Sequence, residues 1–369
     1  MRFRLAPAEG PPIDVANGHL AQPDRPPDFT VSLGDGALRP GLINAHDHLH
    51  RNHYPRLGSP PYPDAYAWGQ DLHARFAADI ARARQLPEAE ALLFGALKNL
   101  LGGVTRVVHH DPWDPRFDAQ FPIGVVPVRA VHSLGFERDF HAAVRGDPRT
   151  ATRPLCLHVA EGVTPAAADE VRDLAGRGLV DEWLLAVHLV GADEHGIGLL
   201  RRGGAAAVWC PTSNEFLFGR GAPTALLRSG VDVLLGTDAL LTGTGTMLDE
   251  LSAARRVGAL DDDRLLAAVG VTAAGRLDIP VPSLDPGSAA DVVMWRRPVL
   301  EARPADIGLV LVGGVPRLGD PEFADLFGRM GVAVERLVVG GRPKLVAAPL
   351  GTVAQRATAI TPSCGRILH

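Results

Sequence analysis

Short apolar runs that each end in a histidine or an aspartate most constrain how this chain can fold. The sequence contains LRPGLINAHDHLH, PLCLHVAEG, WLLAVHLVG and VDVLLGTDAL, in that order. Such runs, rich in leucine, isoleucine and valine, predict strands that are buried on both faces, as in a parallel sheet. The polar side chains then lie at the carboxyl ends of neighbouring strands, where a parallel barrel carries its chemistry.

The first run supplies two histidines at positions i and i+2. Side chains alternate along a strand, so His46 and His48 lie on the same face. Together with His158, His188 and Asp238, which end the later runs, they predict a metal site. Imidazole and carboxylate suit Zn²⁺ or Fe²⁺, and a position left open for water makes such a site catalytic.

Lysine is scarce, and its scarcity limits the kind of metal centre. The two lysines are Lys98, in a helical pattern, and Lys344, which follows a glycine- and proline-rich turn near the C-terminus. A lysine that bridges two metals has to project from a strand end inside a barrel. The sequence therefore predicts a mononuclear site.

Strand patterns alternate with amphipathic helical patterns through the middle of the chain, which predicts βα units. The predicted fold is α/β: a TIM-like (β/α)8 barrel over residues 39–280, with a small β-sandwich domain built from residues 1–38 and 281–369. Between residues 111 and 155 we find one strong strand, over 124–132, where the barrel needs two. Strand four is either a weak strand near 132–136, or the barrel is distorted there.

Charge and composition exclude several classes of partner. The formal net charge of −5 provides no basic face for nucleic acid, and no apolar stretch is long enough to cross a membrane. The N-terminus has no apolar leader, so a cytoplasmic location is expected. Cys156, Cys210 and Cys364 form no CxxC pair and predict neither disulfides nor a zinc ribbon. A small-molecule substrate is the expected partner; homo-oligomerisation stays open.

The motifs together resemble the amidohydrolase superfamily. PGLINAHDH resembles its first strand, and HVAE, AVHLV, WCPTSN and LLGTD resemble strands five to eight. The resemblance covers roughly residues 38–276. It is strongest to the aminohydrolase branch, which includes cytosine, guanine and S-adenosylhomocysteine deaminases and the triazine hydrolases.

The resemblance implies a role for each of these residues. His46, His48, His158 and Asp238 would bind one divalent metal ion, with zinc favoured and iron(II) as the alternative. His188 would lie beside the metal and the substrate, and in some relatives its equivalent is also a ligand. Glu161 would carry the proton, so the implied catalytic residues are Glu161, His188 and Asp238.

The implied activity is hydrolytic deamination of a small nitrogen heterocycle, such as a nucleobase, pterin or nucleoside-like compound. The nucleophile would be a hydroxide formed from water whose pKa the metal lowers. Hydrolysis of a cyclic C–N bond, or of another leaving group, is the alternative on the same scaffold. A non-catalytic barrel used for assembly is a remote third.

Substrate contacts are harder to predict. Residues 53–76 are rich in aromatic side chains and suggest a lid that includes Trp68, while His109 and His132 end strands that could reach the pocket. Roles for His50, His53 and His110 stay open. Thr212, Ser213 and Asn214 are good turn and cap formers, so a structural role is favoured for them. Glu161 could instead cap the helix predicted from Pro165.

Overall fold

Two parallel sheets form the centre of the molecule in the computed structural model, which describes residues 1–118, 121–145 and 152–369. One sheet has three strands and the other has five, and sequence neighbours pair side by side in both. The strands are β6 (Leu42–Asp47), β7 (Val104–His109) and β8 (Gly124–Val126) in the first sheet, and β9 (Arg129–Ser133), β10 (Leu155–Val159), β11 (Leu184–His188), β12 (Ala206–Trp209) and β13 (Asp232–Leu235) in the second. The predicted parallel α/β architecture is confirmed.

The strand predicted over residues 124–132 divides into two. β8 pairs with β7, and β9 pairs with β10, so the chain passes from one sheet to the other across Pro127 and Val128. Proline has no N–H to donate to a ladder, which explains why the pairing changes there. Residues 134–136 form a turn, so a fourth strand near 132–136 is wrong, and the irregularity lies at this short link.

Helices follow most of the parallel strands, as the alternating pattern predicts. α5 begins at Pro165 after Thr164, whose side chain accepts from Ala167 N. α6 ends at Gly203 and is capped by Gly204, which has a left-handed φ of 75°. The helices of this part are α1 (Ala65–Arg75), α2 (Ala77–Ala83), α3 (Glu88–Leu100), α4 (Phe140–Arg145), α5 (Pro165–Gly176), α6 (Glu194–Gly203), α7 (Pro211–Phe218), α8 (Thr224–Leu227), α9 (Met247–Val257), α10 (Asp262–Ala268) and α11 (Val271–Arg276).

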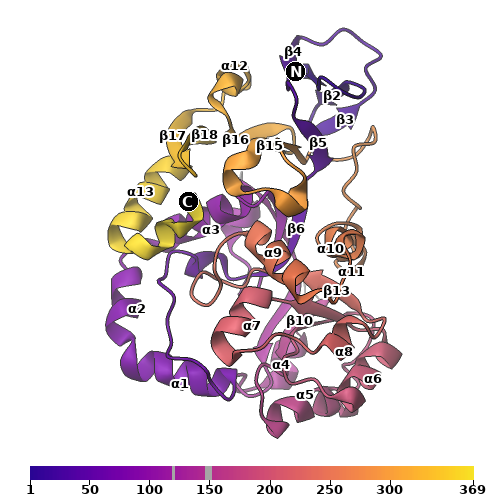
Figure 1. The fold of residues 1–369 in the computed structure, drawn as a ribbon, viewed down its shortest axis with the longest axis vertical. Helices are drawn as coiled ribbons and strands as arrows, with labels where there is room; N and C mark the ends of the chain where they lie inside the picture. Colours follow the sequence, from indigo (N-terminus) through magenta and orange to yellow (C-terminus); the bar gives the residue numbers. More distant parts are fainter. Residues whose placement is uncertain (119–120, 146–151) are drawn as a thin grey trace.

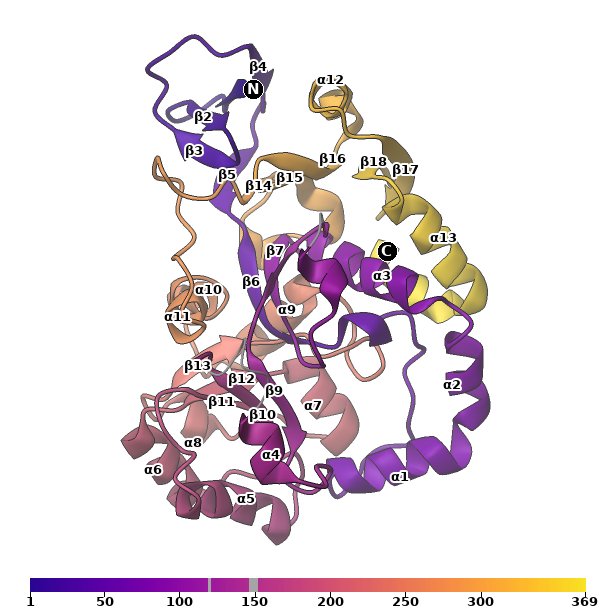
Figure 2. The ribbon, with the colours of Figure 1, turned by 180° about the vertical axis from the view of Figure 1, so that it is seen from behind.

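The two ends of the chain build two further sheets with mostly antiparallel pairing, at the end of the molecule opposite α5 and α6 (Figures 1 and 2). β5 pairs with β14, and side chains from both chain ends share one apolar core, among them Phe3, Leu5 and Leu309. One sheet contains β1 (Arg2–Ala6), β2 (Ile13–Ala16), β3 (His19–Ala21) and β4 (Phe29–Ser32); the other contains β5 (Ala37–Pro40), β14 (Val292–Trp295), β15 (Ile307–Val312), β16 (Val315–Gly319), β17 (Val334–Val339) and β18 (Arg342–Ala347). We call this part the terminal sheets.

The last helices also contact the parallel part. α13 (Leu350–Ile360) packs with α3 in one core, and Arg356 Nη1 lies 2.5 Å from Glu90 Oε1. The final part of the predicted small domain therefore lies against the parallel part of the molecule. The remaining helix is α12 (Ala324–Arg329), and the short 3-10 helices are η1 (Leu49–Arg51), η2 (Pro115–Asp118), η4 (Val299–Glu301), η5 (Pro304–Asp306), η6 (Pro321–Phe323) and η7 (Pro362–Leu368).

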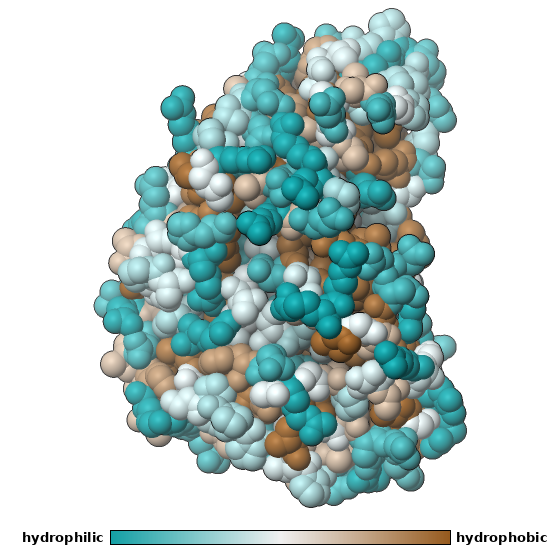
Figure 3. Space-filling model, in the orientation of Figure 1, coloured by the Kyte–Doolittle hydropathy of each residue, from teal (hydrophilic) through white to brown (hydrophobic). Residues whose placement is uncertain are grey.

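Side chains on the face shown in Figure 3 are mixed, with hydrophobic groups lying in separate patches among hydrophilic ones. In the described parts of the chain, every helix is too short or too polar to span a bilayer.

Candidate metal centre and active-site cavity

The predicted ligands meet at the carboxyl ends of the parallel strands. His46 lies in β6 and His48 directly follows it, while Asp47 between them has its side chain in a separate buried network. His158 belongs to β10, and His188 is the last residue of β11. Asp238 follows β13, so residues spread over almost two hundred positions converge as the sequence predicts.

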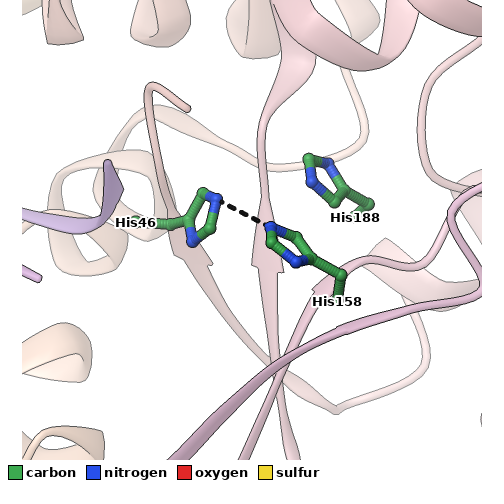
Figure 4. Close-up of side chains that lie close together, drawn as sticks. All are labelled: His46, His158 and His188. Atoms are coloured by element: carbon green, nitrogen blue, oxygen red, sulfur yellow. Dashed lines mark hydrogen bonds between the residues drawn. The ribbon is translucent and has the colours of Figure 1, made fainter. Parts of the chain in front are cut away.

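Distances between the ligand atoms fit a single ion. His46 Nε2 and His158 Nε2 are 3.3 Å apart, and Figure 4 shows both rings turned toward each other beside His188. Asp238 Oδ1 lies 3.7 Å from the Nε2 atoms of both His46 and His48. Ligands of one tetrahedral zinc ion, with bonds of about 2.0–2.1 Å, lie about 3.3 Å from one another.

Hydrogen bonds on the far side of three rings fix their tautomers. The Nδ1–H of His158 donates to the carbonyl oxygen of His132 (2.7 Å), and that of His48 donates to Asp111 Oδ2 (2.6 Å). The Nδ1–H of His188 donates to the side-chain oxygen of Asn214 (2.8 Å). The proton on Nδ1 leaves each Nε2 with a free lone pair facing the site, as a metal ligand requires.

The tautomer of His46 is set through a second histidine. His110 Nε2 lies 2.8 Å from the carbonyl oxygen of Val131, so it carries a proton, and His110 Nδ1 is an acceptor. His46 Nδ1 is 3.2 Å from that acceptor and therefore donates to it. The Nε2 of His46 is left bare, like those of the other rings.

Burial lowers the pKa values of His48, His158 and His188, whereas neighbouring groups keep Asp238 ionised. Burial lowers the pKa of His48 to about 3 and that of His188 to about 4. Burial alone would raise the pKa of Asp238, but the hydrogen bond to His46 and the neighbouring histidines outweigh it, so that pKa is well below its usual range. Neutral imidazoles and an ionised carboxylate are the forms that bind a divalent cation.

A lysine-bridged second metal does not fit this arrangement. Lys98 Nζ lies 3.0 Å from Asp47 Oδ2, and Lys344 Nζ lies 2.5 Å from Asp320 Oδ1, so each ammonium is paired with a carboxylate. A further group, His50, His109 and Asp111, also lies close together. His109 Nδ1 there accepts from the backbone N–H of Leu49, which leaves the proton on its Nε2. The donor set therefore fits one divalent ion.

Glu161 lies beside the ligands, just past the end of β10. Its Oε1 is 3.5 Å from His188 Nε2. Burial, followed by the charges of Asp238, Glu170 and Asp64, raises the pKa of Glu161 well above its usual range. Thr164 caps α5, so the alternative role of Glu161 as the cap is wrong. A protonated carboxyl that faces the site is a proton donor.

Ser213 and Asn214 bond to predicted site residues, which adds to the structural role favoured from sequence, whereas Thr212 bonds to Glu250. Ser213 Oγ donates to Asp238 Oδ2 (2.7 Å), as does Thr242 Oγ1 (2.8 Å), which leaves Oδ1 facing the histidines. Asn214 holds His188 through both its amide atoms. α7 begins here without a side-chain cap, and its N-cap residue is Cys210.

The ligands open into a cavity of about 850 Å³. His48, His158, Glu161, His188 and Asp238 contribute to its lining. Its other walls combine apolar and charged side chains, mainly from α1, α2 and the strand-end loops: Tyr54, Trp68, Leu72, Ile80, Leu86, Phe136, Leu241, Arg51, Arg84, Glu88 and Glu137.

The residues predicted to touch substrate have different positions. Trp68 and His132 line the cavity, and the indole N–H of Trp68 donates to the carbonyl oxygen of Leu57 (3.0 Å). His50 and His53 also line it. His109 instead packs edge-on against Phe117 and accepts from Leu49 N, and it is not among the described residues that line the cavity.

Sequence reasoning missed the partners that orient the ligands. Asp111 is the clearest case. It directly follows His109 and His110 at the end of β7, and its side chain accepts a hydrogen bond from His48, which follows the adjacent strand β6. A carboxylate immediately past a predicted strand end was a usable signal, because such residues face the same mouth as the ligands. Nothing in sequence spacing connects Asn214 with His188.

Several site residues also have an unusual backbone conformation. His188 has a φ of 75° and Asp238 a φ of 51°, and Ala160 and Leu189 are also left-handed. Non-glycine residues in this region cost of order 1–3 kcal/mol each and persist where the surroundings hold them. The backbone at these strand ends is therefore strained, which lowers the free energy of unfolding, and the strain lies at the site.

Both curated proteins and solved structures resemble this chain. A search against models of protein families finds no match. Two curated 5-methylthioadenosine/S-adenosylhomocysteine deaminases are similar: that of Pelotomaculum thermopropionicum is 31% identical over 180 residues, and that of Carboxydothermus hydrogenoformans is 30% identical over 164. The alignments cover 42% and 38% of this chain. They span 40% and 37% of the two relatives.

Solved structures match nearly the whole chain. An adenosine deaminase from Xanthomonas campestris with bound zinc has a TM-score of 0.69 at 19% identity, covering 98% of both chains. The zinc complex of an atrazine chlorohydrolase from Arthrobacter aurescens TC1 has a TM-score of 0.66 at 17% identity, covering 97% of this chain and 99% of that one. An amidohydrolase from a Sargasso Sea sample has a TM-score of 0.61 at 15% identity, covering 86% and 92%.

The chain has the same fold as these solved structures. The resemblance predicted from the strand-end motifs is thereby confirmed. At these identities the solved structures establish the fold, and the activity of this chain has to be argued from its own site.

Proposed function

We propose that this protein is a metal-dependent hydrolase that deaminates a small nitrogen heterocycle. The observation that carries the proposal is the convergence of four bare imidazole nitrogens and Asp238 beside Glu161, whose pKa is raised by burial. The similar deaminases and the zinc-containing structures support the same activity. We also propose zinc as the ion, with iron(II) as the alternative, and a barrel over residues 39–280 beside a β-sandwich from both chain ends.

His46, His48, His158 and Asp238 would hold the ion, with His188 as an optional fifth ligand. When bound, a divalent ion in such a site lowers the pKa of water and polarises the group under attack. Asp238 is placed to accept a proton through Oδ1, because Ser213 and Thr242 occupy its other oxygen. Its lowered pKa means that it is ionised, with Oδ1 available to accept a hydrogen bond from the attacking water.

Glu161 supplies the complementary proton. Attack on an amidine-like ring carbon places negative charge on the adjacent nitrogen, and an acid within hydrogen-bond reach stabilises that charge. Glu161 has the raised pKa that such an acid needs. Glu161 gives its proton to the ring nitrogen. The proton that Asp238 takes from the attacking water passes to the amino group, which leaves as ammonia, and the remaining hydroxyl proton returns to Glu161 as the ring carbon becomes a carbonyl.

His188 has a defined part in this scheme. Its Nδ1 is committed to Asn214, so its Nε2 acts as an acceptor toward the attacking oxygen or as a ligand. Either use orients the oxygen toward the ring carbon. Asn214 acts through His188 and is a positioning residue.

The cavity suggests a substrate larger than a free base. About 850 Å³ lies in the upper part of the range typical of drug-sized ligands. Trp68 offers an indole fixed by Leu57, and His132 lies near the ligand His158. We propose that the heterocycle lies against His132 and Glu161, while a substituent extends toward Trp68 and the apolar side of α1.

The proposal is tested by ammonia release from a panel of aminated purines, pyrimidines, pterins and their nucleosides, using protein loaded with one equivalent of zinc. Turnover is expected for at least one substituted heterocycle. Silence across the panel in the zinc-loaded protein would count against deamination. Product mass separates the alternative, since ring opening adds water without loss of ammonia.

A further inference from the structure

The outer strands of the two parallel sheets meet at the metal centre. The carbonyl oxygen of His46 on β6 accepts from the backbone N–H groups of Thr237 (3.0 Å) and Asp238 (3.1 Å), which follow β13. Asp238 is left-handed, with a φ of 51°. Two of the proposed ligands thus come from different sheets, and their relative position depends on what fixes this junction.

Lys98 reaches the junction from α3 and is fully buried. Its Nζ donates to Thr237 Oγ1 (2.8 Å) and to the backbone carbonyl oxygen of Asp238 (3.2 Å), and it lies 3.0 Å from Asp47 Oδ2. An ammonium has three donors, and each has an oxygen partner here. Lys98 therefore connects both sheets at one point.

Asp47 is the matching group on β6, between His46 and His48. It is fully buried and accepts from Asn52 Nδ2 (2.8 Å) and Asn99 Nδ2 (2.7 Å) as well as facing Lys98. The strand alternation that turns both histidines to the metal turns this carboxylate to Lys98. Its position is therefore tied to theirs.

A gain in stability does not explain why the ion pair of Lys98 and Asp47 is buried. Two charges removed from water pay a large desolvation cost, and apolar replacements of buried pairs are often neutral or stabilising. What an apolar pair lacks is direction: it provides no donor for the carbonyl of a left-handed Asp238. The retained charges point to a geometric role.

We propose that Lys98 and Asp47 are positioning residues that set the distance between the β6 histidines and Asp238, and so determine metal affinity. The proposal rests on the metal centre of the proposed function. It adds residues that touch neither the ion nor the substrate.

The chain contains a matched control. Lys344, its other lysine, is also buried and pairs with Asp320 in the terminal sheets. It donates to two further oxygens, the carbonyls of Ala305 (2.9 Å) and Ile307 (2.6 Å). The two pairs share burial and bonding pattern, but just one of them touches the metal centre.

The experiment compares Lys98→Met/Asp47→Asn with Lys344→Met/Asp320→Asn. Near-UV circular dichroism and thermal unfolding report the fold, competition with a chromogenic chelator gives the zinc Kd, and the visible spectrum of the Co²⁺ form reports ligand geometry. We expect the first variant to bind zinc about 10–100-fold more weakly, with an altered Co²⁺ spectrum. The control should keep the wild-type Kd and spectrum, whatever its stability.

A wild-type Kd in Lys98→Met/Asp47→Asn, or equal weakening in both variants, overturns the proposal. If the first variant does not fold, Thr237→Val decides, because it removes the hydroxyl that Lys98 binds and keeps the charges. Weaker zinc binding with an altered Co²⁺ spectrum then supports the proposal, and wild-type values overturn it. Wild-type protein that binds zinc but releases no ammonia would overturn the proposed function alone.

Discussion

The carboxyl ends of the parallel strands, which we call the mouth, and the terminal sheets bury different kinds of side chain. At the mouth, histidines, carboxylates, amides and hydroxyls are buried together, whereas the terminal sheets close on a core of phenylalanine, leucine and valine. An apolar core is tolerant of small shifts, while a polar cluster depends on the direction of every bond. Changes at the mouth should therefore affect function before stability, and changes in the terminal sheets the reverse.

The largest effect is expected at Glu161. Glu161→Gln keeps the size of the side chain but removes the transferable proton, so kcat should fall by about 10²–10⁴-fold. Zinc content, measured by atomic absorption, and the thermal midpoint should stay at wild-type values or above. Loss of zinc in this variant would mean that Glu161 is a ligand rather than a proton carrier.

Asp111, the hydrogen-bond partner of His48, should affect zinc affinity rather than the rate of the chemical step. Asp111→Asn weakens the hydrogen bond to Nδ1, so zinc affinity should fall by about 10–100-fold with little change in the unfolding midpoint. A chelator titration measures the Kd. Full activity at saturating zinc with a wild-type Kd would show that this contact does not orient His48.

The terminal sheets should show the opposite behaviour. Phe3 is 1% exposed and stacks on Phe29, so Phe3→Ala should lower the free energy of unfolding by about 3–5 kcal/mol. Denaturant unfolding measures this loss, and the zinc Kd of the folded fraction should not change. A coupled loss of affinity would mean that the two regions do not act separately.

The pH dependence of stability should differ in sign between the regions. Burial raises the pKa of Glu250, whose carboxyl accepts from Thr212 N at 2.9 Å, to about 8. Its contribution is fully present below the unfolded pKa of about 4.3 and is lost as pH rises through about 8. In the terminal sheets, the hydrogen bond from Arg4 lowers the pKa of Asp14 despite its burial. Its contribution is present above an unfolded pKa of about 3.9 and is lost as pH falls through the folded value.

Two substitutions separate these contributions. Glu250→Gln should flatten the decline in stability between pH 5 and 8, by roughly 2–4 kcal/mol at most, and Asp14→Asn should flatten the decline below about pH 4. Urea unfolding at several pH values measures both slopes. Unchanged slopes in either variant would assign the pH dependence to other groups.

What the sequence revealed follows from local periodicity. The i, i+2 spacing of His46 and His48 needs a strand alone, and His158, His188 and Asp238 each end an apolar run, so the convergence of these side chains was predictable. The division at Pro127 was also visible in principle, since proline interrupts a ladder. Asp111 could have been found from its place just past a strand end, whereas the contact between Asn214 and His188 could not, because it joins residues from different elements whose distance depends on the tertiary fold. Trp68 was found by composition, while its contact with Leu57 was not.

The two buried lysines also allow the rate of opening to be measured by chemical labelling. Reagents that modify amines need a free, accessible ammonium, and the folded chain withholds both Lys98 and Lys344 from solvent. Modification of either residue therefore requires a local or global opening. Mass spectrometry of the two peptides after timed labelling would record how often the metal centre opens, separately from the terminal sheets, without a substitution anywhere in the chain.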